Sequence, residues 1–359
     1  MTTPPVASVE GLLEGAEHEQ VVFGHDRDTG LRAIIAIHST ALGPALGGTR
    51  FKAYPDLGAA VQDVLRLARA MTYKNAAAGL DFGGGKAVIV GDPAAVRSEE
   101  LIRSYARHVH RLGGAYLTAE DVGTTQADMD LIRQETRYVT GTSPELGGSG
   151  DPSEATAVGL FAAMKAVAAH LWSTDDIGGR SVTISGVGKV GSHLAALLAG
   201  AGARVAVADV NAEAARRTAE MTGAETVDPD AALSRRCDIV SPCALGGVLD
   251  AESIPKLQCR AVVGAANNQL ADDSCAPALA ERGILYAPDF LVNAGGVINI
   301  SEEVGGYDRE RALARVAGIG ATLTQVLQRA ASEGTTPLQA AIDRAEERLG
   351  AARVRAAGR

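Results

Sequence analysis

The amino-acid sequence predicts an α/β fold with two domains, one of them built on a doubly wound parallel sheet. The chain has 359 residues, which is long for a single hydrophobic core. From Ser181 onward, short apolar runs rich in β-branched residues alternate with helical patterns, as in a parallel sheet that helices cover on both faces. The preceding stretch 141–153 is rich in Gly, Ser and Pro and is interpreted as the domain boundary.

The first part of the chain contains the elements of a smaller α/β domain. The run Leu31–His38 is apolar and rich in isoleucine, and it predicts a strand. Apolar residues between Leu57 and Thr72 recur at the spacing of one helix face, which predicts a helix. A short strand is also expected at Ala87–Val90, with helices at Glu99–Leu112 and Ala127–Glu135.

The second part follows a regular alternation of strands and helices. Its first helix, expected at Thr156–Leu171, carries a single Lys and is therefore expected to be well buried. The expected strands are Ser181–Ser185, Arg204–Ala208, Asp238–Ser241, Ala261–Gly264 and Ile284–Ala287. Two long helices are expected at Arg309–Ser332 and Pro337–Ala352.

Composition and charge argue against several classes of protein. With 46% hydrophobic and 21% charged residues, the chain is that of an ordinary globular protein. The net charge of −9 argues against a nucleic-acid partner, because such proteins are usually basic. The first twenty residues have acids but no Lys or Arg, unlike a signal peptide, and the uncharged stretch 33–49 is too short and too polar to cross a membrane. We expect a cytoplasmic protein with no membrane partner.

The cysteines give no sign of a metal centre. Their spacing does not match a zinc site, and no histidine cluster accompanies them. They lie in one later segment of a long chain, and we expect reduced thiols rather than disulfides. The four residues are Cys237, Cys243, Cys259 and Cys275. No metal is expected.

A glycine pattern between an expected strand and an expected helix predicts a nucleotide site. In such a turn, Gly186 permits the tight bend, Gly188 lets the backbone approach a pyrophosphate, and Gly191 lets the helix pack on the strand. The helix N-terminus attracts phosphates. Asp209 ends the next strand, where it would bond the ribose hydroxyls and repel a 2′-phosphate, so NAD is favoured over NADP. The alternative is a structural turn without nucleotide. The expected contacts of this Rossmann-type domain are Gly186, Val187, Gly188, Lys189, Val190, Gly191, Ser192 and Asp209.

Two lysines and one aspartate are candidates for chemistry. Lys74 lies just past the expected helical face, and Lys86 closes a glycine run between a turn and a strand. A ligand can approach a lysine beside glycines closely, and a second cation with partial burial would lower the pKa of its amine. Asp121 lies on a loop suited to proton transfer. The alternatives are solvated surface lysines, a phosphate nest at the glycine run, and a helix cap at Asp121.

Seven segments, in order along nearly the whole chain, resemble the family of glutamate, leucine, phenylalanine and valine dehydrogenases, and most closely its leucine/valine branch. Together they are far more specific than any one of them alone. They are Gly43–Arg50, Met71–Gly79, Gly83–Lys86, Thr118–Gly123, Gly186–Gly188, Pro242–Gly247 and Tyr286–Gly296. Leucine dehydrogenases often have alanine where Gly191 stands here.

The resemblance implies a role for individual residues. Lys74 would hold the substrate carboxylate, Lys86 would activate water, and Asp121 would exchange a proton with the substrate nitrogen. The backbone at Gly47 and Gly48 would help to seat the carboxylate. Further implied contacts are Asn268 with substrate and cofactor, and Thr156, Cys243, Ala244 and Asn293 with the cofactor.

The substrate expectation follows from the apolar character of the corresponding pocket positions. These are Leu46, Ala119, Val297 and Ile300. A second substrate carboxylate would be costly there, whereas a branched aliphatic side chain would gain about 1.5–3 kcal/mol from burial. We therefore expect NAD-dependent, reversible oxidative deamination of valine, leucine and isoleucine to 2-oxo acids and ammonium.

Three other functions remain open at this stage. Phenylalanine is the alternative substrate, because pocket depth is not visible in the sequence. A 2-hydroxy acid dehydrogenase usually requires a histidine base, and none of the histidines lies in a matching motif. These are His38, His108, His110, His170 and His193. The third alternative is a catalytically silent NAD-binding protein.

The expected organisation has three ranges. Residues 1–140 would form a substrate-binding and oligomerisation domain, and 141–332 the NAD-binding domain. The helix at 333–359 would pack back on the first domain. By resemblance, the protein would be a homo-oligomer whose partner is a small amino acid.

Overall fold

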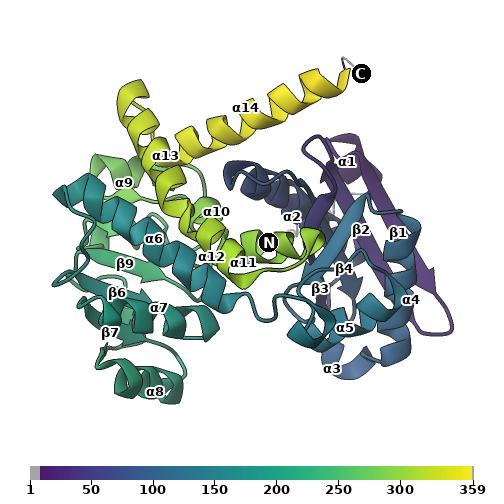
Figure 1. Cartoon of the computed structure of the whole chain (residues 1–359), viewed down its shortest axis with the longest axis horizontal. Helices are drawn as coiled ribbons and strands as arrows, with labels where there is room; N and C mark the ends of the chain where they lie inside the picture. Colours follow the sequence, from purple (N-terminus) through teal and green to yellow (C-terminus); the bar gives the residue numbers. More distant parts are fainter. Residues whose placement is uncertain (1–8, 358–359) are drawn as a thin grey trace, which may run out of the picture. The chain divides into compact units, whose positions relative to one another are not determined.

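The computed structural model describes residues 9–357 and divides into two compact units. The first comprises Met1–Asp151, Ile300–Asp308 and Ala345–Arg359, and the second comprises Pro152–Asn299 and Arg309–Arg344. The first division therefore falls at 151/152, where the sequence predicted 140/141. Each unit has its own sheet (Figure 1).

The first unit contains a five-stranded sheet in the order β1-β2-β4-β3-β5. The strands are β1 (Gln20–Asp26), β2 (Leu31–Ser39), β3 (Ala45–Lys52), β4 (Gly83–Val90) and β5 (Tyr116–Glu120). Strands β3, β4 and β5 run parallel, while β1 and β2 form an antiparallel hairpin and β2 pairs antiparallel with β4. Strand β3 thus lies between β4 and β5, so residues from three separate segments meet at its end.

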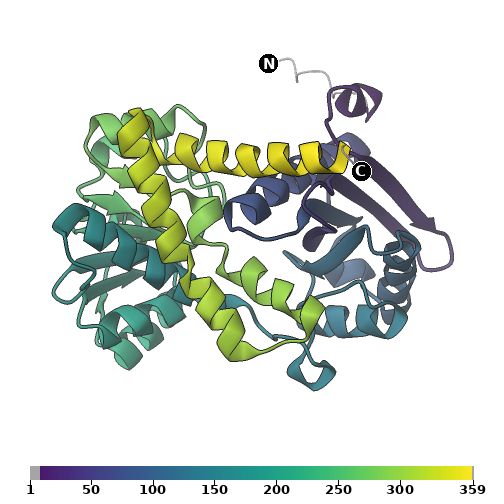
Figure 2. The same cartoon turned by 45° about the horizontal axis from the view of Figure 1, so that its top comes forward.

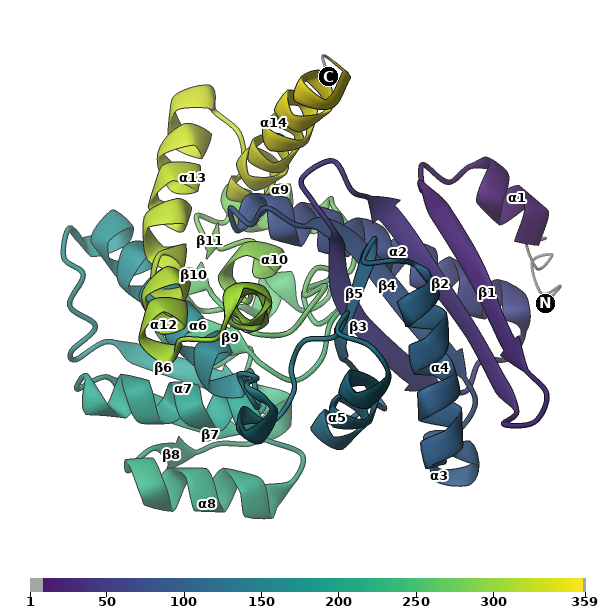
Figure 3. The ribbon, with the colours of Figure 1, turned by 45° about the vertical axis from the view of Figure 1, so that its right-hand side comes forward.

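Alternation along β2 fixes the two faces of this sheet. Ile35 and Ile37 belong to one apolar cluster with helix α4 (Glu99–Arg111), whereas Ile34 and Ala36 belong to another with helix α2 (Leu57–Ala77). Figure 3 shows α2 and α4 on opposite sides of the strands. The remaining short helices of the unit are α1 (Val9–Glu14), α3 (Pro93–Val96) and α5 (Gln126–Glu135).

The second unit contains a six-stranded parallel sheet in the order β11-β10-β9-β6-β7-β8. Read from β8, this is the 3-2-1-4-5-6 order of doubly wound dinucleotide-binding sheets. The strands are β6 (Ser181–Ser185), β7 (Arg204–Ala208), β8 (Glu225–Thr226), β9 (Ile239–Pro242), β10 (Ala261–Val262) and β11 (Leu285–Tyr286). The predicted fold class is confirmed.

The helices of the second unit include one that is buried along much of its length. Helix α6 (Ser153–Trp172) is, within 9–357, the one helix long and apolar enough to cross a membrane, but it packs on α7, α12 and α13 and so forms part of a core. The others are α7 (Lys189–Gly200), α8 (Ala212–Thr222), α9 (Cys275–Glu281), α10 (Asp289–Val292), α11 (Gly295–Ser301), α12 (Arg309–Ala317), α13 (Ile319–Glu333) and α14 (Pro337–Ala357). All four cysteines carry free thiols.

Several elements differ from the sequence predictions. The helix expected at Arg309–Ser332 is two helices, α12 and α13, which meet at Gly318 (Figure 2, yellow-green). Gly318 is the residue that precedes the first turn of α13, and its N–H donates to the Arg315 carbonyl at 3.0 Å. The last two predicted strands, β10 and β11, retain only two paired residues each. Strands β1, β3, β5 and β8 were not predicted.

The C-terminal part of α14 belongs to the first unit. One guanidinium nitrogen of Arg348 donates to the carbonyls of Ala76 and Leu80, at 2.9 and 3.1 Å, at the end of α2. The other contacts the Asp81 carboxylate at 2.9 Å. Arg348 therefore adds a side-chain donor to the carbonyls at the end of α2 and in the turn after it, and fastens α14 to this turn.

The glycine run before Lys86 is part of strand β4 and is forced by close packing. A Cβ on Gly83 would lie 1.9 Å from the Ser39 carbonyl, and one on Gly84 would lie 2.1 Å from the Thr72 backbone. The run is neither a turn nor a phosphate nest, because it pairs with β2 and β3. The glycines leave room for the neighbouring backbone of β2 and α2, not for a ligand.

We predict that Gly84→Ala lowers the free energy of unfolding by about 1–3 kcal/mol, because the added methyl overlaps the α2 backbone. Gly350→Ala is the matched control: a Cβ there has nothing within 4 Å, and alanine favours a helix interior by roughly 0.5–1 kcal/mol. Urea unfolding of both variants measures the difference. Equal stability of the two variants would show that β4 tolerates a side chain at this position.

Candidate active site

Two glycines in β3 let this strand lie close to the end of β5, where Asp121 follows. Gly47 and Gly48 pair with Thr118 and Ala119 in parallel register. A Cβ on Gly48 would lie 2.4 Å from the Glu120 carbonyl and 2.9 Å from the Asp121 Cβ. Any larger residue at position 48 would displace the carboxylate-bearing backbone, so the glycine is a geometric requirement of the site.

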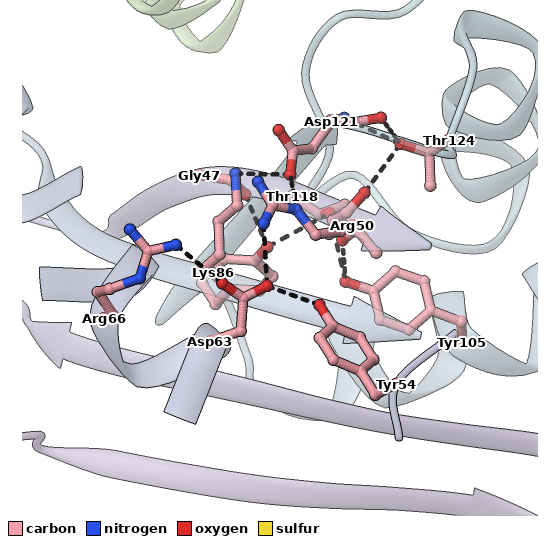
Figure 4. A network of polar contacts seen from close by, with 12 residues as sticks. Gly47, Arg50, Tyr54, Asp63, Arg66, Lys86, Tyr105, Thr118, Asp121 and Thr124 are labelled. Carbon is pink, nitrogen blue, oxygen red and sulfur yellow. Dashed lines mark hydrogen bonds and ion pairs between the residues drawn. The ribbon is translucent and has the colours of Figure 1, made fainter. Parts of the chain in front are cut away.

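Lys86 and Asp121 form an ion pair. The Lys86 Nζ lies 3.2 Å from the Asp121 Oδ2, and Lys86 is only 6% exposed (Figure 4). The loop that carries Asp121 is fixed because its N–H donates to the Thr124 hydroxyl, which in turn donates to the Thr49 carbonyl, each at 2.9 Å. Asp121 is therefore not the cap of α5, a role that Thr125 fills.

A second cation contacts the same carboxylate oxygen. The Arg50 Nε lies 3.1 Å from the Asp121 Oδ2. Burial of Asp121 opposes its ionisation, but the charges of Lys86 and Arg50 outweigh this effect and hold the pKa of Asp121 below its usual range. The aspartate is thus an ionised, partly buried proton acceptor.

Arg50 is itself held by a network on α2 that the sequence analysis did not assign. Its terminal nitrogen lies 2.9 Å from the Asp63 Oδ2, which also accepts the Tyr54 hydroxyl at 2.7 Å. Arg66 contacts the other Asp63 oxygen at 3.0 Å. Burial and the bond to Asp63 raise the pKa of Tyr54. The only sequence signal for Arg50 was its place at the end of the Gly43–Arg50 segment.

A layer of buried hydroxyls lies beneath β3 and supports it. Thr49 Oγ1 contacts the Tyr105 hydroxyl at 2.5 Å and the Thr118 hydroxyl at 2.6 Å. The Tyr116 hydroxyl donates to the Gly47 carbonyl at 2.6 Å. Burial raises the pKa of Tyr105 to about 12, so this layer stays neutral near physiological pH. Its role is to fix the strand rather than to exchange protons.

Lys74 lies within the last turn of α2, not beyond its end as predicted. The amide of the next residue, Asn75, donates to the Leu46 carbonyl at 3.2 Å and to the Gly83 carbonyl at 2.6 Å. These bonds fasten the end of α2 to β3 and β4. Lys74 is half-buried and lies on the helix that covers the sheet face of Lys86.

Two of the four expected pocket residues share that face. Ala36 belongs to the apolar cluster under α2 and pairs with Lys86, so Lys86 lies on the α2 face of the sheet. Gly84, two residues before Lys86, lies on the same face and pairs with Leu46. By this alternation Leu46 and Ala119 lie on the α2 face, and both are buried. Ile300 also belongs to the first unit: a Cβ on Gly141 would lie 4.0 Å from both the Ile300 Cγ2 and the Glu120 nitrogen. Val297, one turn earlier on α11, is buried in the second unit.

The glycine loop of the second unit has the geometry that a dinucleotide requires. Gly186 has φ +103°, and a Cβ on Gly191 would lie 2.0 Å from the Gly186 carbonyl, so the helix packs tightly on the turn. An alanine at position 191 would force this loop to shift. Gly188, by contrast, has open space where a Cβ would stand, and no side chain caps α7. This concave backbone at a helix N-terminus fits a pyrophosphate.

Asp209 follows β7 and is fixed beside this loop. Its two oxygens accept the backbone N–H groups of Val187 and Asn211, each at 2.8 Å. A carboxylate oxygen has a second lone pair, so acceptor capacity remains for ribose hydroxyls. The loop and Asp209 therefore fit a dinucleotide without a 2′-phosphate. Beside it, in the first turn of α7, lie the exposed Lys189 and the half-buried Val190 and Ser192.

The other expected cofactor contacts gather at the carboxyl ends of the same strands. A Cβ on Gly186 would lie 2.6 Å from the Ala244 Cβ, and the Cys243 N–H donates to the Ser185 carbonyl at 2.7 Å. Asn293 donates to the Asn267 side chain at 2.9 Å. This edge of a doubly wound sheet is where such folds bind ligands.

Asn268 and Thr156 are also placed in the second unit. Asn268 has φ +52°, a left-handed conformation that asparagine tolerates, and its carbonyl accepts the Gly247 N–H at 2.7 Å. Thr156 lies in the first turn of α6, and its hydroxyl donates to the Pro152 carbonyl at 3.0 Å. A Cβ on Gly296 would lie 3.0 Å from that hydroxyl, so Thr156 sits against the start of α11.

These two units define a class of protein. A doubly wound sheet with a glycine-rich loop, accompanied by an α/β unit that holds a buried lysine–aspartate pair, is the architecture of a two-domain dehydrogenase. In the part of the chain that the structure describes, no group of three or more His, Cys, Asp or Glu side chains could hold a metal ion.

Comparison with known proteins identifies the family. The model of the Glu/Leu/Phe/Val dehydrogenase dimerisation domain matches residues 18–138, and that of Glutamate/Leucine/Phenylalanine/Valine dehydrogenase matches 147–217 and 207–356. The chain belongs to this family and is an amino acid dehydrogenase.

Individual relatives cover almost the whole chain. Leucine dehydrogenase of Bacillus cereus is 49% identical over 337 residues, with 94% of this chain and 92% of the relative covered. Valine dehydrogenase of Streptomyces virginiae is 52% identical over 339 residues, covering 94% and 95%. The crystal structure of L-tryptophan dehydrogenase from Nostoc punctiforme has a TM-score of 0.82 at 39% identity and covers 96% of this chain and 98% of that one.

Asp63 gives a pH-dependent prediction. Its pKa lies below the usual value because the Tyr54 bond and the Arg50 charge outweigh its burial. A depressed folded-state pKa stabilises the protein above the unfolded pKa of about 4, and this contribution is lost as the pH falls further. We expect Asp63→Asn to lower the free energy of unfolding by about 1–2 kcal/mol at pH 7, with the difference shrinking below about pH 4.

Urea unfolding between pH 7 and pH 3.5 measures this effect. Asp81→Asn is the matched control, because the Asp81 side chain is 89% exposed and its contact with Arg348 should contribute less than about 0.5 kcal/mol. A difference for Asp63→Asn that does not change with pH would contradict the assigned ion pair.

Proposed function

We propose that this protein catalyses the reversible, NAD-dependent oxidative deamination of valine, leucine and isoleucine to 2-oxo acids with release of ammonium. The observation that carries this proposal is the buried contact between Lys86 and Asp121, on a sheet face that also bears the apolar Leu46 and Ala119. A cation for a second substrate carboxylate is not among these pocket positions. The names of the relatives, leucine and valine dehydrogenases, support the same substrate class.

The roles of the polar residues follow from their chemistry. Lys74 binds the substrate carboxylate, assisted by the backbone of Gly47 and Gly48. Asp121, as a carboxylate, takes a proton from the substrate nitrogen. Lys86, as a neutral amine, takes a proton from the water that attacks the substrate carbon, and Asp121 then returns its proton to the departing nitrogen.

The cofactor proposal rests on the fit of the second unit. NAD, when bound, supplies the acceptor for the two electrons that the substrate carbon loses. The residues that would hold it are those of the glycine loop, with Asp209 at the ribose. Thr156 and Asn293 would contact the nicotinamide side, Cys243 and Ala244 would contact the cofactor, and Asn268 would touch both ligands. The protein's share is orientation, exclusion of water and proton transfer.

The rival hydroxy acid reaction finds less support. His38 is the one buried histidine among those considered, and its ring nitrogen contacts the Thr72 hydroxyl at 2.9 Å. Burial lowers the pKa of His38 to about 4, so it is a poor base near neutral pH. It lies between β2 and α2 and serves their packing.

We further propose a homo-oligomer in the cytoplasm. The model that matches residues 18–138 describes a dimerisation domain, which supports subunit contacts through the first unit. The substrate partner is a small amino acid.

An absorbance assay tests the substrate proposal. We expect NADH formation from NAD⁺ with L-valine, L-leucine and L-isoleucine, weaker turnover with L-phenylalanine, and none with L-glutamate or 2-hydroxyisovalerate. NADP⁺ should be a poor substitute because Asp209 repels its 2′-phosphate. Turnover with the hydroxy acid alone would select the rival enzyme, and NAD⁺ binding without turnover would select a silent binding protein.

The role of Lys86 is tested separately. Lys86→Ala should lower kcat by at least about 10³-fold, because it removes the base that activates water. Affinity for NAD⁺, measured by calorimetry, should be unchanged. Lys52→Ala is a control with an exposed lysine on the neighbouring strand β3 and should keep normal turnover. Retention of most activity in Lys86→Ala would remove Lys86 from the mechanism.

A further inference from the structure

The Asp121 carboxylate is held asymmetrically. Both cations that touch it, Lys86 and Arg50, contact Oδ2, at 3.2 and 3.1 Å. The two oxygens are therefore chemically different: one lies between two positive charges, while the other is the better proton acceptor.

The two cations differ in how constant their charge is. Lys86 must lose and regain a proton in the proposed reaction, so its electrostatic attraction to Asp121 weakens when its amine is neutral. A guanidinium stays protonated in proteins. Arg50 thus provides a contact that persists through every protonation state of Lys86.

Arg50 can act as a fixed point because it is anchored elsewhere. Arg50 lies on β3, and its planar guanidinium links two other segments. Its Nε donates to Asp121 in the loop after β5, and a terminal nitrogen donates to Asp63 on α2. Asp63 is in turn fixed by the Tyr54 hydroxyl. The charged groups that face Asp121 are therefore Lys86 from β4, Arg50 from β3 and, through Arg50, Asp63 from α2. Glu120 precedes it in the chain.

We propose that Arg50 is a positioning residue of the reaction: it fixes Oδ2 of Asp121 so that Oδ1 exchanges the proton with the substrate nitrogen. This inference rests on the proposed function. Arg50 touches neither the reacting carbon nor the cofactor in this scheme, and it acts only through Asp121. A lysine in its place could keep one contact but not the fork to Asp63.

A double-mutant cycle tests the proposal on the full-length protein. Arg50→Gln should lower kcat for L-valine by about 10²-fold with KM changed by less than about threefold, because a misplaced proton acceptor affects the chemical step more than binding. Arg50→Lys should recover about tenfold of this loss. In the Asp121→Asn background, Arg50→Gln should change kcat by less than about twofold.

Arg66→Gln is the matched control. Arg66 is also bonded to Asp63, but its side chain is 55% exposed and does not contact Asp121, so kcat should stay within about twofold of wild type. Thermal unfolding of each variant separates loss of folded protein from loss of turnover. If Arg50→Gln does not fold, the cycle with Arg50→Lys carries the same test.

The outcomes are distinct. Additive losses for Arg50 and Asp121, or an activity loss that follows only the folded fraction, would overturn the role of Arg50 and leave the proposed function intact. Absence of turnover in the wild-type protein with every amino acid would overturn the proposed function itself.

Discussion

The first unit depends on one interaction, the contact of a partly buried carboxylate with two cations from neighbouring strands. Asp121 would be costly to bury alone, and Lys86, at 6% exposure, would be equally costly. Their meeting is possible only because Gly48 lets the chain after β5 come within reach of β3, and because the glycines of β4 let α2 and β2 press against the strand. Close backbone packing is thus the precondition of the charge arrangement.

This constraint explains why the candidate site residues were easier to name from the sequence than the strands that carry them. Lys74, Lys86 and Asp121 were predicted because they stand in distinctive segments. Strand β3, which joins them, was not predicted, because Gly47, Gly48 and the preceding proline weaken any strand pattern. Its strand conformation is imposed by pairing on both sides with β4 and β5. Tertiary pairing here overrides local propensity.

The second unit was easier to predict because its signals are local. Strands β6, β7 and β9 are short runs rich in β-branched residues, and the glycine loop lies between a strand and a helix as the motif requires. What the sequence could not give are long-range contacts of ordinary residues. Arg50 contacts Asp63, thirteen residues away, and Asp121, seventy-one residues away. Nothing in the spacing of these residues distinguishes them from surface charges.

The electrostatics of Asp121 bear on what it does in the proposed reaction. A carboxyl whose pKa is held down by two cations binds a proton weakly, so it is unsuited to storing one. It is suited to passing a proton on, provided that the next acceptor is within reach. In the proposed reaction this acceptor is the departing nitrogen, to which Asp121 returns the proton. The pair therefore divides the proton transfers of the proposed reaction: Asp121 exchanges a proton with the substrate nitrogen, and Lys86, 3.2 Å away, takes one from water.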